Sequence, residues 1–302
     1  MSIPIIGPEA ESKLDWLDLA RAIAAGHELP RAEIDDTFLY RDPDTLLSRA
    51  AWIDGLGALV KTATIFPGNK AHGRPAIGGA VSLFSDTDGT LAAMLDFALV
   101  TKWKTAGDSL LGAMRLARPD SKRILIVGGG TVARSLHQAY SAAFPEATFA
   151  TWSRTEATAR AFAEEAGIEA ASDLETAVRA ADIVTCATMA TEPVLHGDWL
   201  RPGQHVDLIG AYRPDMREAD DAVLRRADIF VDARATTMDH IGELKIPLAQ
   251  GVIVPGDIRA DFYDGDAMRR ESKDQITLFK NGGGAHLDLM VARYILDAVG
   301  SP

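Results

Sequence analysis

One segment near the middle of the chain carries a glycine-rich turn directly after an apolar run. The run Arg123–Val127 leads into Gly128-Gly-Gly130, and an amphipathic segment, 131–144, follows. A strand that enters a helix through such a turn can hold a pyrophosphate, because the first backbone N–H groups of the helix face the phosphates. Gly128 permits the tight turn, Gly130 allows close approach of the phosphates, and Ala133 keeps the helix near the strand.

The glycine motif alone is weak evidence, but its surroundings support it. Apolar strands alternate with helices from about 122 to 233, which predicts a doubly wound parallel sheet of the α/β class. A glycine-rich turn in another kind of α/β protein remains an alternative. The expected strands are 123–127, 147–152, 168–171, 182–188, 205–210 and 228–232, and the expected helices are 131–144, 155–166 and 173–180.

The residues after the second strand of this region indicate which dinucleotide binds. A chain selective for NAD usually has Asp or Glu here to hold the ribose 2′-hydroxyl. Ser153, Arg154 and Thr155 instead offer a cation and two hydroxyl groups to a 2′-phosphate. The sequence therefore favours NADP(H), with NAD(H) possible, unless Arg154 is only a solvated residue at a helix start.

The first 120 residues have a different pattern. Strand-like runs at 58–66, 79–84 and 89–96 are separated by turn signals, which is typical of antiparallel connections, and a helix is expected at 100–117. We predict two domains: residues 1–118 with a mixed sheet, completed by a C-terminal helix at about 284–302, and a nucleotide-binding domain at 119–283. The active site is expected between them, at the carboxyl ends of the parallel strands.

Composition excludes several classes of protein. The chain has 302 residues, 47% of them hydrophobic and 25% charged, as in ordinary soluble globular proteins of two domains. No run approaches the roughly 18 apolar residues of a membrane span. The net charge of −12 argues against binding to nucleic acid or to an anionic membrane, since both need a basic face. The N-terminus lacks the pattern of a secretory signal, and a cytoplasmic location is expected.

The cysteine and the histidines carry no sign of further chemistry. Cys186 is the single cysteine and lies in an apolar run, so we interpret it as a buried strand thiol rather than a nucleophile. His72 and His240 lack metal-ligand spacing, and the carboxylates at 215–221 are interpreted as a solvated helix start. We therefore predict no metal site.

Several separate motifs occur in a fixed order along the chain. They are residues 60–69, 88–96, 101–106, the glycine turn, 152–155, 190–193, 210–218 and 278–282. As a set they resemble the ornithine cyclodeaminase/mu-crystallin family over most of the chain from Lys61 onward. The resemblance implies a Rossmann domain for NAD(P), a second α/β domain that forms a homodimer, and imine or amine chemistry on a small anionic amino or imino acid.

The resemblance also implies roles for particular residues. Lys61 falls on a lysine that contacts the substrate carboxylate beside the reacting carbon, and Lys104 stands where most members have arginine. We take both as catalytic and substrate-binding candidates, the alternative being that they are solvated surface residues. Arg49 is a further candidate for the carboxylate, with Arg41 as its rival, and Gly282 belongs to a loop that closes over the ligands.

The nucleotide site that the resemblance implies includes the nicotinamide side of the cleft, at 188–189 and 208–211, and Asn281 in the closing loop. His286 can be interpreted as catalytic or as a packed residue at a helix N-terminus. The cofactor-binding candidates are Gly128, Gly130, Thr131, Val132, Ala133, Ser153, Arg154, Thr155, Thr188, Met189, Leu208, Gly210, Ala211 and Asn281.

Tyr212 distinguishes branches of the family. In the cyclodeaminases this position is an aspartate that acts on the substrate amines, and a phenol with a reference pKa of about 10 cannot replace it as a proton acceptor. The sequence around Tyr212 is similar to that of mu-crystallin and of bacterial ketimine reductases. We predict an NADPH-dependent reductase of an α-imino acid, such as Δ1-pyrroline-2-carboxylate or Δ1-piperideine-2-carboxylate. A reductive aminase of a small keto acid, a redox-neutral ornithine cyclodeaminase and a non-catalytic NADPH-binding protein are the alternatives.

Overall fold

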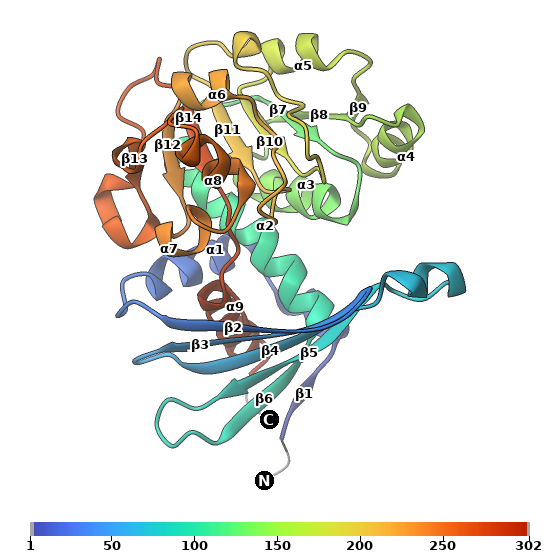
Figure 1. Ribbon diagram of the computed structural model, residues 1–302, viewed down its shortest axis with the longest axis vertical. Helices are drawn as coiled ribbons and strands as arrows, with labels where there is room; N and C mark the ends of the chain where they lie inside the picture. Colours follow the sequence, from blue (N-terminus) through green and yellow to red (C-terminus); the bar gives the residue numbers. More distant parts are fainter. Residues whose placement is uncertain (1–2, 301–302) are drawn as a thin grey trace. The chain divides into compact units, whose positions relative to one another are not determined.

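The computed structural model describes residues 3–300 and divides into two compact units (Figure 1). Unit 1 comprises 1–104 and 283–302, and unit 2 comprises 105–282. The contacts place the division inside a helix, whereas the sequence places it at the end of that helix, and the domain boundaries stay a prediction. Residues 1–2 and 301–302, which the predicted N-terminal segment and C-terminal helix include, lie outside the described residues.

Unit 2 is built on an eight-stranded sheet in which every neighbouring pair is parallel. The strand order is β13-β12-β14-β11-β10-β7-β8-β9, so the winding direction reverses between β7 and β10. This confirms the doubly wound parallel sheet. The strands are β7 (Arg123–Val127), β8 (Thr148–Trp152), β9 (Glu169–Ala170), β10 (Ile183–Cys186), β11 (His205–Leu208), β12 (Asp228–Val231), β13 (Ile258–Ala260) and β14 (Thr277–Lys280).

The helices of unit 2 begin and end at residues suited to those positions. The Asp173 carboxylate accepts a hydrogen bond from the backbone N–H of Thr176 at the start of α5, and Gly167 ends α4 with a φ of 67°. The helices are α3 (Thr131–Ala143), α4 (Glu156–Ala166), α5 (Leu174–Ala180), α6 (Asp221–Arg226), α7 (Arg234–Thr237) and α8 (Gly242–Ala249). Short 3₁₀ turns are η3 (Gly197–Trp199), η4 (Pro255–Asp257) and η5 (Phe262–Ala267).

Unit 1 has a six-stranded mixed sheet in the order β1-β6-β5-β4-β3-β2. Only β1 pairs in parallel, with β6, and the other described pairs are antiparallel, which confirms the second α/β fold. The elements are β1 (Ile5–Ile6), η1 (Pro8–Lys13), α1 (Trp16–Gly26), β2 (Glu33–Arg41), β3 (Asp44–Ile53), β4 (Gly57–Ile65), η2 (Pro67–His72), β5 (Ile77–Phe84), β6 (Leu91–Asp96), the start of α2 (Phe97–Leu116) and α9 (Ala285–Val299).

Helix α9 lies against the sheet of unit 1 and packs on β2, β3, β4 and β5, while α1 packs on α9 (Figure 1). Ten of its side chains are buried, as its apolar composition predicts. The sheet face beneath α9 is lined by the inward residues of each strand, because successive side chains of a strand point to opposite faces. In β4 these are Leu59, Lys61 and Ala63, all buried. A lysine therefore stands in an otherwise apolar layer.

Candidate active site

Lys61 is the buried cation around which the candidate site of unit 1 is built. It lies on the inward face of β4, only 5% exposed, and is the register partner of Arg49 on β3. Directly opposed residues of an antiparallel pair point to the same face, so both cations face α9. The Lys61 ammonium lies over the ring of Phe97, 4.7 Å from its centroid. The alternative that Lys61 is a solvated surface residue is wrong.

Helix α2 supplies two more groups. The Asp96 carboxylate accepts a hydrogen bond from Leu99 N at 2.7 Å at the start of this helix. Thr101 and Lys104 are three residues apart and share a helix face. Lys61 Nζ donates to Thr101 Oγ1 at 2.7 Å, and Lys104, 7% exposed, donates to the carbonyl oxygen of Gly283 at 2.9 Å. Lys104 is therefore not a solvated residue either.

These cations meet at one carboxylate, Asp288, in the first turn of α9. Its Oδ1 lies 2.9 Å from Lys61 Nζ and 3.8 Å from Lys104 Nζ, and its Oδ2 lies 3.8 Å from Arg49 Nη1. We call Arg49, Lys61 and Lys104 around Asp288 the cationic cluster. Arg49 also donates to Gly283 O at 3.1 Å. The structure therefore brings together three of the predicted substrate-binding residues, around an aspartate that the sequence analysis missed.

The three cations of the cluster determine the ionisation state of Asp288. Asp288 is completely buried, which by itself disfavours its charged form, but the charges of Lys104, Lys61 and Arg49 hold its pKa below the usual value. Asp36 pairs with the far side of Arg49 at 2.6 Å. Asp288 therefore stays ionised although it is buried, because three cations surround it.

Two other candidates from the sequence lie in unit 1: Arg41, the alternative to Arg49 for the carboxylate, and His286, a possible catalytic residue. Arg41 pairs with Asp44 and is 77% exposed, so Arg49 rather than Arg41 joins the cluster. His286, in the first turn of α9, is fully buried, and burial together with His27 and Lys104 lowers its pKa well below the usual value. A histidine that stays neutral in this way cannot be a proton donor near neutral pH.

The predicted nucleotide turn of unit 2 has the geometry of an anion site. Gly128 has a φ of 135°, and a Cβ there would lie 2.7 Å from Ala187 O, so only glycine fits. Gly130 caps α3 without a side-chain hydrogen bond, and a Cβ at that residue would meet nothing within 4 Å. Thr131 and Val132 are exposed beside it, whereas Ala133 is buried against the sheet. The start of α3 therefore offers backbone N–H groups and open space to a pyrophosphate.

The segment after β8 carries the predicted 2′-phosphate contacts. Arg154 and Thr155 are exposed and Ser153 is half-buried. Thr155 caps α4 without a side-chain hydrogen bond. A cation and a free hydroxyl at a helix start are suited to a phosphate group.

The loops after β10 and β11 touch each other through a buried glutamate. Glu218 Oε1 accepts hydrogen bonds from Thr188 N at 2.7 Å and Thr188 Oγ1 at 2.8 Å, and its Oε2 accepts from Gly210 N at 2.6 Å. A Cβ on Gly210 would lie 1.9 Å from Thr188 O. Two of the predicted nicotinamide-side residues are therefore joined by Glu218. The interpretation of 215–221 as a solvated helix start is wrong for Glu218, which is fully buried.

Glu218 is one of two buried glutamates in this part of unit 2. Glu243, on α8, accepts hydrogen bonds from the backbone N–H groups of Glu218 and Ala219 at 2.7 and 3.0 Å. Burial, with the neighbouring Glu243 carboxylate, raises the pKa of Glu218 to about 8. Lys280 is also buried and donates to Leu208 O and Asn281 O, so its charge partly balances the pair.

The other predicted cofactor residues differ in exposure. Met189 is exposed on the same loop as Thr188, whereas the side chains of Leu208 and Ala211 are buried, so any ligand contact of the latter two is through the backbone. Asn281 donates to Thr105 O and Ser109 Oγ within unit 2. Their roles stay predictions, as does that of Gly282, whose N–H donates to Asp232 at 3.0 Å.

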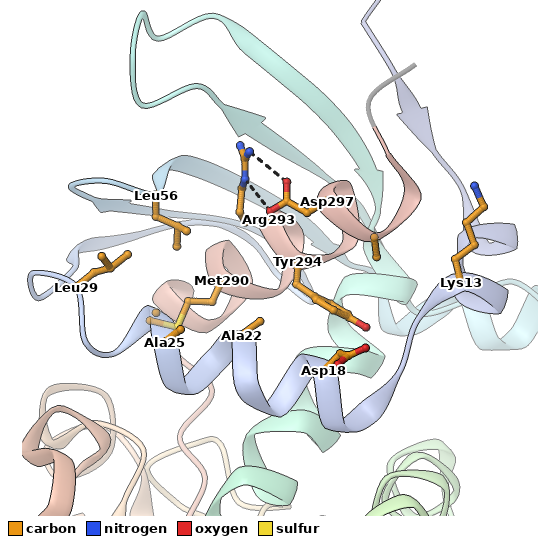
Figure 2. Close-up of a pocket in the computed structure, with 12 residues that line it drawn as sticks. Lys13, Asp18, Ala22, Ala25, Leu29, Leu56, Met290, Arg293, Tyr294 and Asp297 are labelled. Carbon is orange, nitrogen blue, oxygen red and sulfur yellow. Dashed lines mark hydrogen bonds and ion pairs between the residues drawn. The ribbon is translucent and has the colours of Figure 1, made fainter.

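A separate cavity of about 620 Å³ lies between α1 and α9 in unit 1 (Figure 2). Its polar groups already have protein partners: Arg293 pairs with Asp297, Lys13 donates to Val299 O, and the Tyr294 hydroxyl donates to Asp15 O. It also lacks the cations of the cationic cluster. We therefore assign the candidate site to the cationic cluster rather than to this cavity.

Other chemistries have no support among residues 3–300. Burial raises the pKa of the Cys186 thiol well above its usual value, as expected for an inert strand residue. No group of three His, Cys, Asp or Glu in this part of the chain could hold a metal ion. None of its helices is long and apolar enough to cross a membrane.

The glycine turn, the parallel sheet and its switch point define a Rossmann-type α/β protein joined to a second, mixed-sheet unit. The sequence profile of the ornithine cyclodeaminase/mu-crystallin family matches residues 54–301. The chain belongs to this family.

Named relatives cover nearly the whole chain. The Delta(1)-pyrroline-2-carboxylate reductase of Paracoccus denitrificans is 52% identical over 296 residues, which are 95% of this chain and 94% of the relative. An archaeal alanine dehydrogenase dimer with bound NAD has a TM-score of 0.89 and 27% identity, covering 99% of this chain and 96% of that one. The Delta(1)-pyrroline-2-carboxylate reductase of Thermococcus litoralis, solved with NADH and L-proline, has a TM-score of 0.88 and 24% identity over 98% and 97% of the chains, and shows the same fold.

Proposed function

We propose that the chain reduces a cyclic α-imino acid, such as Δ1-pyrroline-2-carboxylate or Δ1-piperideine-2-carboxylate, with a reduced nicotinamide cofactor. It is an NAD(P)-dependent oxidoreductase that acts on C=N bonds. The observation that carries the proposal is the buried cationic cluster in a chain 52% identical to a Delta(1)-pyrroline-2-carboxylate reductase. The cluster supplies the charge that an α-carboxylate needs, and the glycine turn supplies the nucleotide site.

The cationic cluster gives the substrate its orientation. Lys61 and Lys104 bind the carboxylate as point charges, and Arg49 adds a planar donor that Asp36 holds in place. Because Lys61 and Lys104 are buried, their attraction for the carboxylate is less screened than it would be at the surface. Fixing the carboxylate in this way presents the planar C=N group in one orientation, which is the protein's main contribution to a hydride transfer.

A reduced nicotinamide cofactor, when bound, would supply the hydride. The backbone N–H groups at the start of α3 would bind its pyrophosphate, and Glu218 holds the Thr188 and Gly210 loops together on the side predicted for the nicotinamide. Hydride addition to a protonated imine leaves a secondary amine, so no metal or covalent enzyme intermediate is needed. His286 stays neutral and is not assigned as the proton donor.

We further propose that NADPH is preferred over NADH, with Arg154 on the 2′-phosphate. Its exposure at the start of α4 beside the uncapped Thr155 hydroxyl supports this. Titration of nucleotide fluorescence with wild type and Arg154→Gln tests it. We expect the Kd for NADPH to rise about tenfold in the variant and the Kd for NADH to stay constant, as one lost charge-assisted contact implies. Equal NADPH and NADH affinities in wild type would contradict it.

A homodimer is proposed from the edge of the sheet in unit 1. All nine residues of β2 are exposed, and Phe38, Leu39 and Tyr40 form an apolar run on this edge strand. Monomeric proteins usually protect such edges, so a second copy of the chain is the fitting cover.

Reductive amination of a small keto acid is the second candidate, because the archaeal alanine dehydrogenase shares the fold at 27% identity. Ornithine cyclodeamination is disfavoured by Tyr212, which stands in place of the catalytic aspartate. The test is a panel: NADPH oxidation with the two cyclic imines, NADPH oxidation with pyruvate plus ammonia, and ammonia release from ornithine. We expect turnover with the cyclic imines to exceed turnover with pyruvate plus ammonia and with ornithine by at least about a hundredfold, because several specific contacts to the substrate provide discrimination of this size. No turnover with either cyclic imine would refute the proposal.

A further inference from the structure

Arg134, near the start of α3, contacts the back of the glycine turn. Its Nη1 donates to the carbonyl oxygens of Gly129 at 2.7 Å and of Gly130 at 3.3 Å. Gly130 is the N-cap of α3, so its carbonyl also accepts the first helical hydrogen bond, from Arg134 N at 3.3 Å. Gly129 precedes the helix, so its carbonyl lies outside the helical hydrogen-bond pattern. One side chain therefore holds the carbonyl groups of two successive residues of the turn.

The two carbonyl groups set the direction of the N–H groups that follow them. In a planar trans peptide unit the C=O of one residue and the N–H of the next point in opposite directions. Because Gly129 O and Gly130 O face Arg134, the N–H groups of Gly130 and Thr131 point away from it. Within residues 3–300 neither of these N–H groups donates to a protein acceptor, and a Cβ on Gly130 would meet open space. Both are therefore available to a pyrophosphate.

Helix α4 holds the guanidinium of Arg134 in one orientation. Its Nε donates to Glu165 Oε2 at 2.8 Å, and its Nη2 lies 2.7 Å from the same oxygen. Its Cζ lies 5.0 Å from the centroid of the Phe162 ring. A planar guanidinium held by a carboxylate on one edge and by a ring on one face keeps its remaining nitrogen on the turn. Because its positive charge is paired with Glu165, we expect Arg134 to act on a bound anion through the geometry of the turn rather than through its charge.

We propose that Arg134 is a positioning residue of the nucleotide site: it holds the carbonyl groups of Gly129 and Gly130 so that the N–H groups that follow them stay directed at the pyrophosphate. The inference rests on the proposed function and adds to its nucleotide site a residue that acts without contacting the ligand. NADPH and NADH share the pyrophosphate, so loss of Arg134 should weaken both by the same factor. Since this contact is the same before and during hydride transfer, KM for the cofactor should rise while kcat stays constant.

Fluorescence titration of Arg134→Met with NADPH and with NADH is the main test. Methionine keeps an unbranched side chain that can pack on Phe162 but has no donor for the two carbonyl groups. We expect both Kd values to rise about tenfold, with their ratio unchanged, as the loss of hydrogen bonds from a charged donor implies. Arg160→Met is the matched control, because Arg160 forms an exposed pair with Glu156 on α4, and it should leave both Kd values at the wild-type level.

Three outcomes would overturn the inference. A rise in the Kd for NADPH alone would mean that Arg134 contacts the 2′-phosphate directly. A lower Tm with unchanged Kd values would mean that it only joins α3 to α4. Tighter binding of both nucleotides by Glu165→Gln, which leaves the charge of Arg134 unpaired, would mean that charge rather than geometry matters.

Arg134→Lys gives a second test. Lysine keeps the charge and a donor but lacks the planar fork, so we expect both Kd values to lie between those of wild type and of Arg134→Met. Values as high as those of Arg134→Met would contradict the proposed role. If Arg134→Met does not fold, wild-type Kd values in Arg134→Lys would contradict it instead.

The measurements separate this inference from the proposed function. Loss of affinity in Arg134→Met, with no reduction of cyclic imines by the wild-type chain, would refute the proposed function and support the role of Arg134. Full reductase activity with unchanged Kd and KM values in Arg134→Met would refute only that role. A wild-type chain that binds neither nucleotide would refute both.

Discussion

Replacement of Glu218 by glutamine should change how the stability of the protein depends on pH. The folded protein raises the pKa of this carboxyl from its reference value of 4.5 to about 8, through burial and the neighbouring Glu243 carboxylate. Between these two values the folded protein keeps a proton that the unfolded chain has released. The free energy of unfolding therefore falls as the pH rises, by about 1.4 kcal/mol per pH unit and about 5 kcal/mol over the whole interval.

Glutamine has no titrating group, so Glu218→Gln lacks this loss. The variant has a constant penalty instead, because the amide NH₂ faces either Gly210 N or the two donors of Thr188, and a lost buried hydrogen bond costs about 1–3 kcal/mol. Relative to wild type, the variant should gain stability steadily from pH 5 to pH 8. Over these three pH units the gain is about 4 kcal/mol, and because 1 kcal/mol corresponds to roughly 2 °C in Tm for a chain of this length, the relative gain in Tm is roughly 8 °C.

Thermal unfolding of both proteins at half-unit steps of pH measures the difference directly, and groups such as His205 cancel because they are present in both. Glu175→Gln, which removes an exposed carboxylate of α5, is the control and should follow the wild-type profile. A difference between wild type and Glu218→Gln that stays constant with pH would refute the reasoning. It would mean that the three donors to Glu218 outweigh burial and keep it ionised.

Three further predictions concern the nucleotide turn, the cationic cluster and the sheet edge. Gly128→Ala should lower the free energy of unfolding by about 3 kcal/mol, because residue 128 has a φ of 135° and its Cβ would contact Ala187 O. Gly130→Ala, whose Cβ would meet open space, should keep its Tm but weaken NADPH binding in fluorescence titration. Similar losses of Tm in both variants would contradict this. Lys61→Met should lower kcat/KM for the cyclic imine at least about a hundredfold without changing the Kd for NADPH. It should also lower the Tm, because Asp288 loses its closest cation. An unaltered kcat/KM would show that Lys61 does not belong to the site. Leu39→Lys, on the exposed edge strand β2, should give a monomer in sedimentation analysis and should retain folding and cofactor binding. An unchanged sedimentation coefficient would show that this edge is not the dimer interface.

The sequence predicted six of the eight strands of unit 2, because their signals are local, and it missed β13 and β14. The apolar run Arg123–Val127 is a strand over those same residues, since a strand buried on both faces needs unbroken apolar side chains and the glycines end it. The C-terminal helix, expected at about 284–302, is present at Ala285–Val299 because its apolar pattern is also local. By contrast, β2 was missed, because all its positions are exposed and it contains charged residues in place of an alternating apolar pattern.

The two buried acids of the candidate sites were missed because their burial depends on distant parts of the chain. Asp288 is one of two acids in a largely apolar helix, and its partners lie on β3, β4 and α2. Glu218 stands in a charge-rich segment typical of a solvated helix start, but it hydrogen-bonds to the loops after β10 and β11 and its backbone contacts Glu243 of α8. The local sequence pattern predicts the secondary-structure element, whereas contacts with distant parts of the chain determine which charged side chains are buried.

The most direct test of the account is isotope transfer from the cofactor to the substrate. NADPH carrying deuterium at both hydrogen positions of C4 is incubated with the protein and Δ1-pyrroline-2-carboxylate, and the amino acid formed is analysed by mass spectrometry and NMR. Direct hydride transfer predicts proline with one deuterium at the α-carbon and one NADPH consumed for each proline formed. Unlabelled proline, or no product while NADPH remains bound, would contradict it.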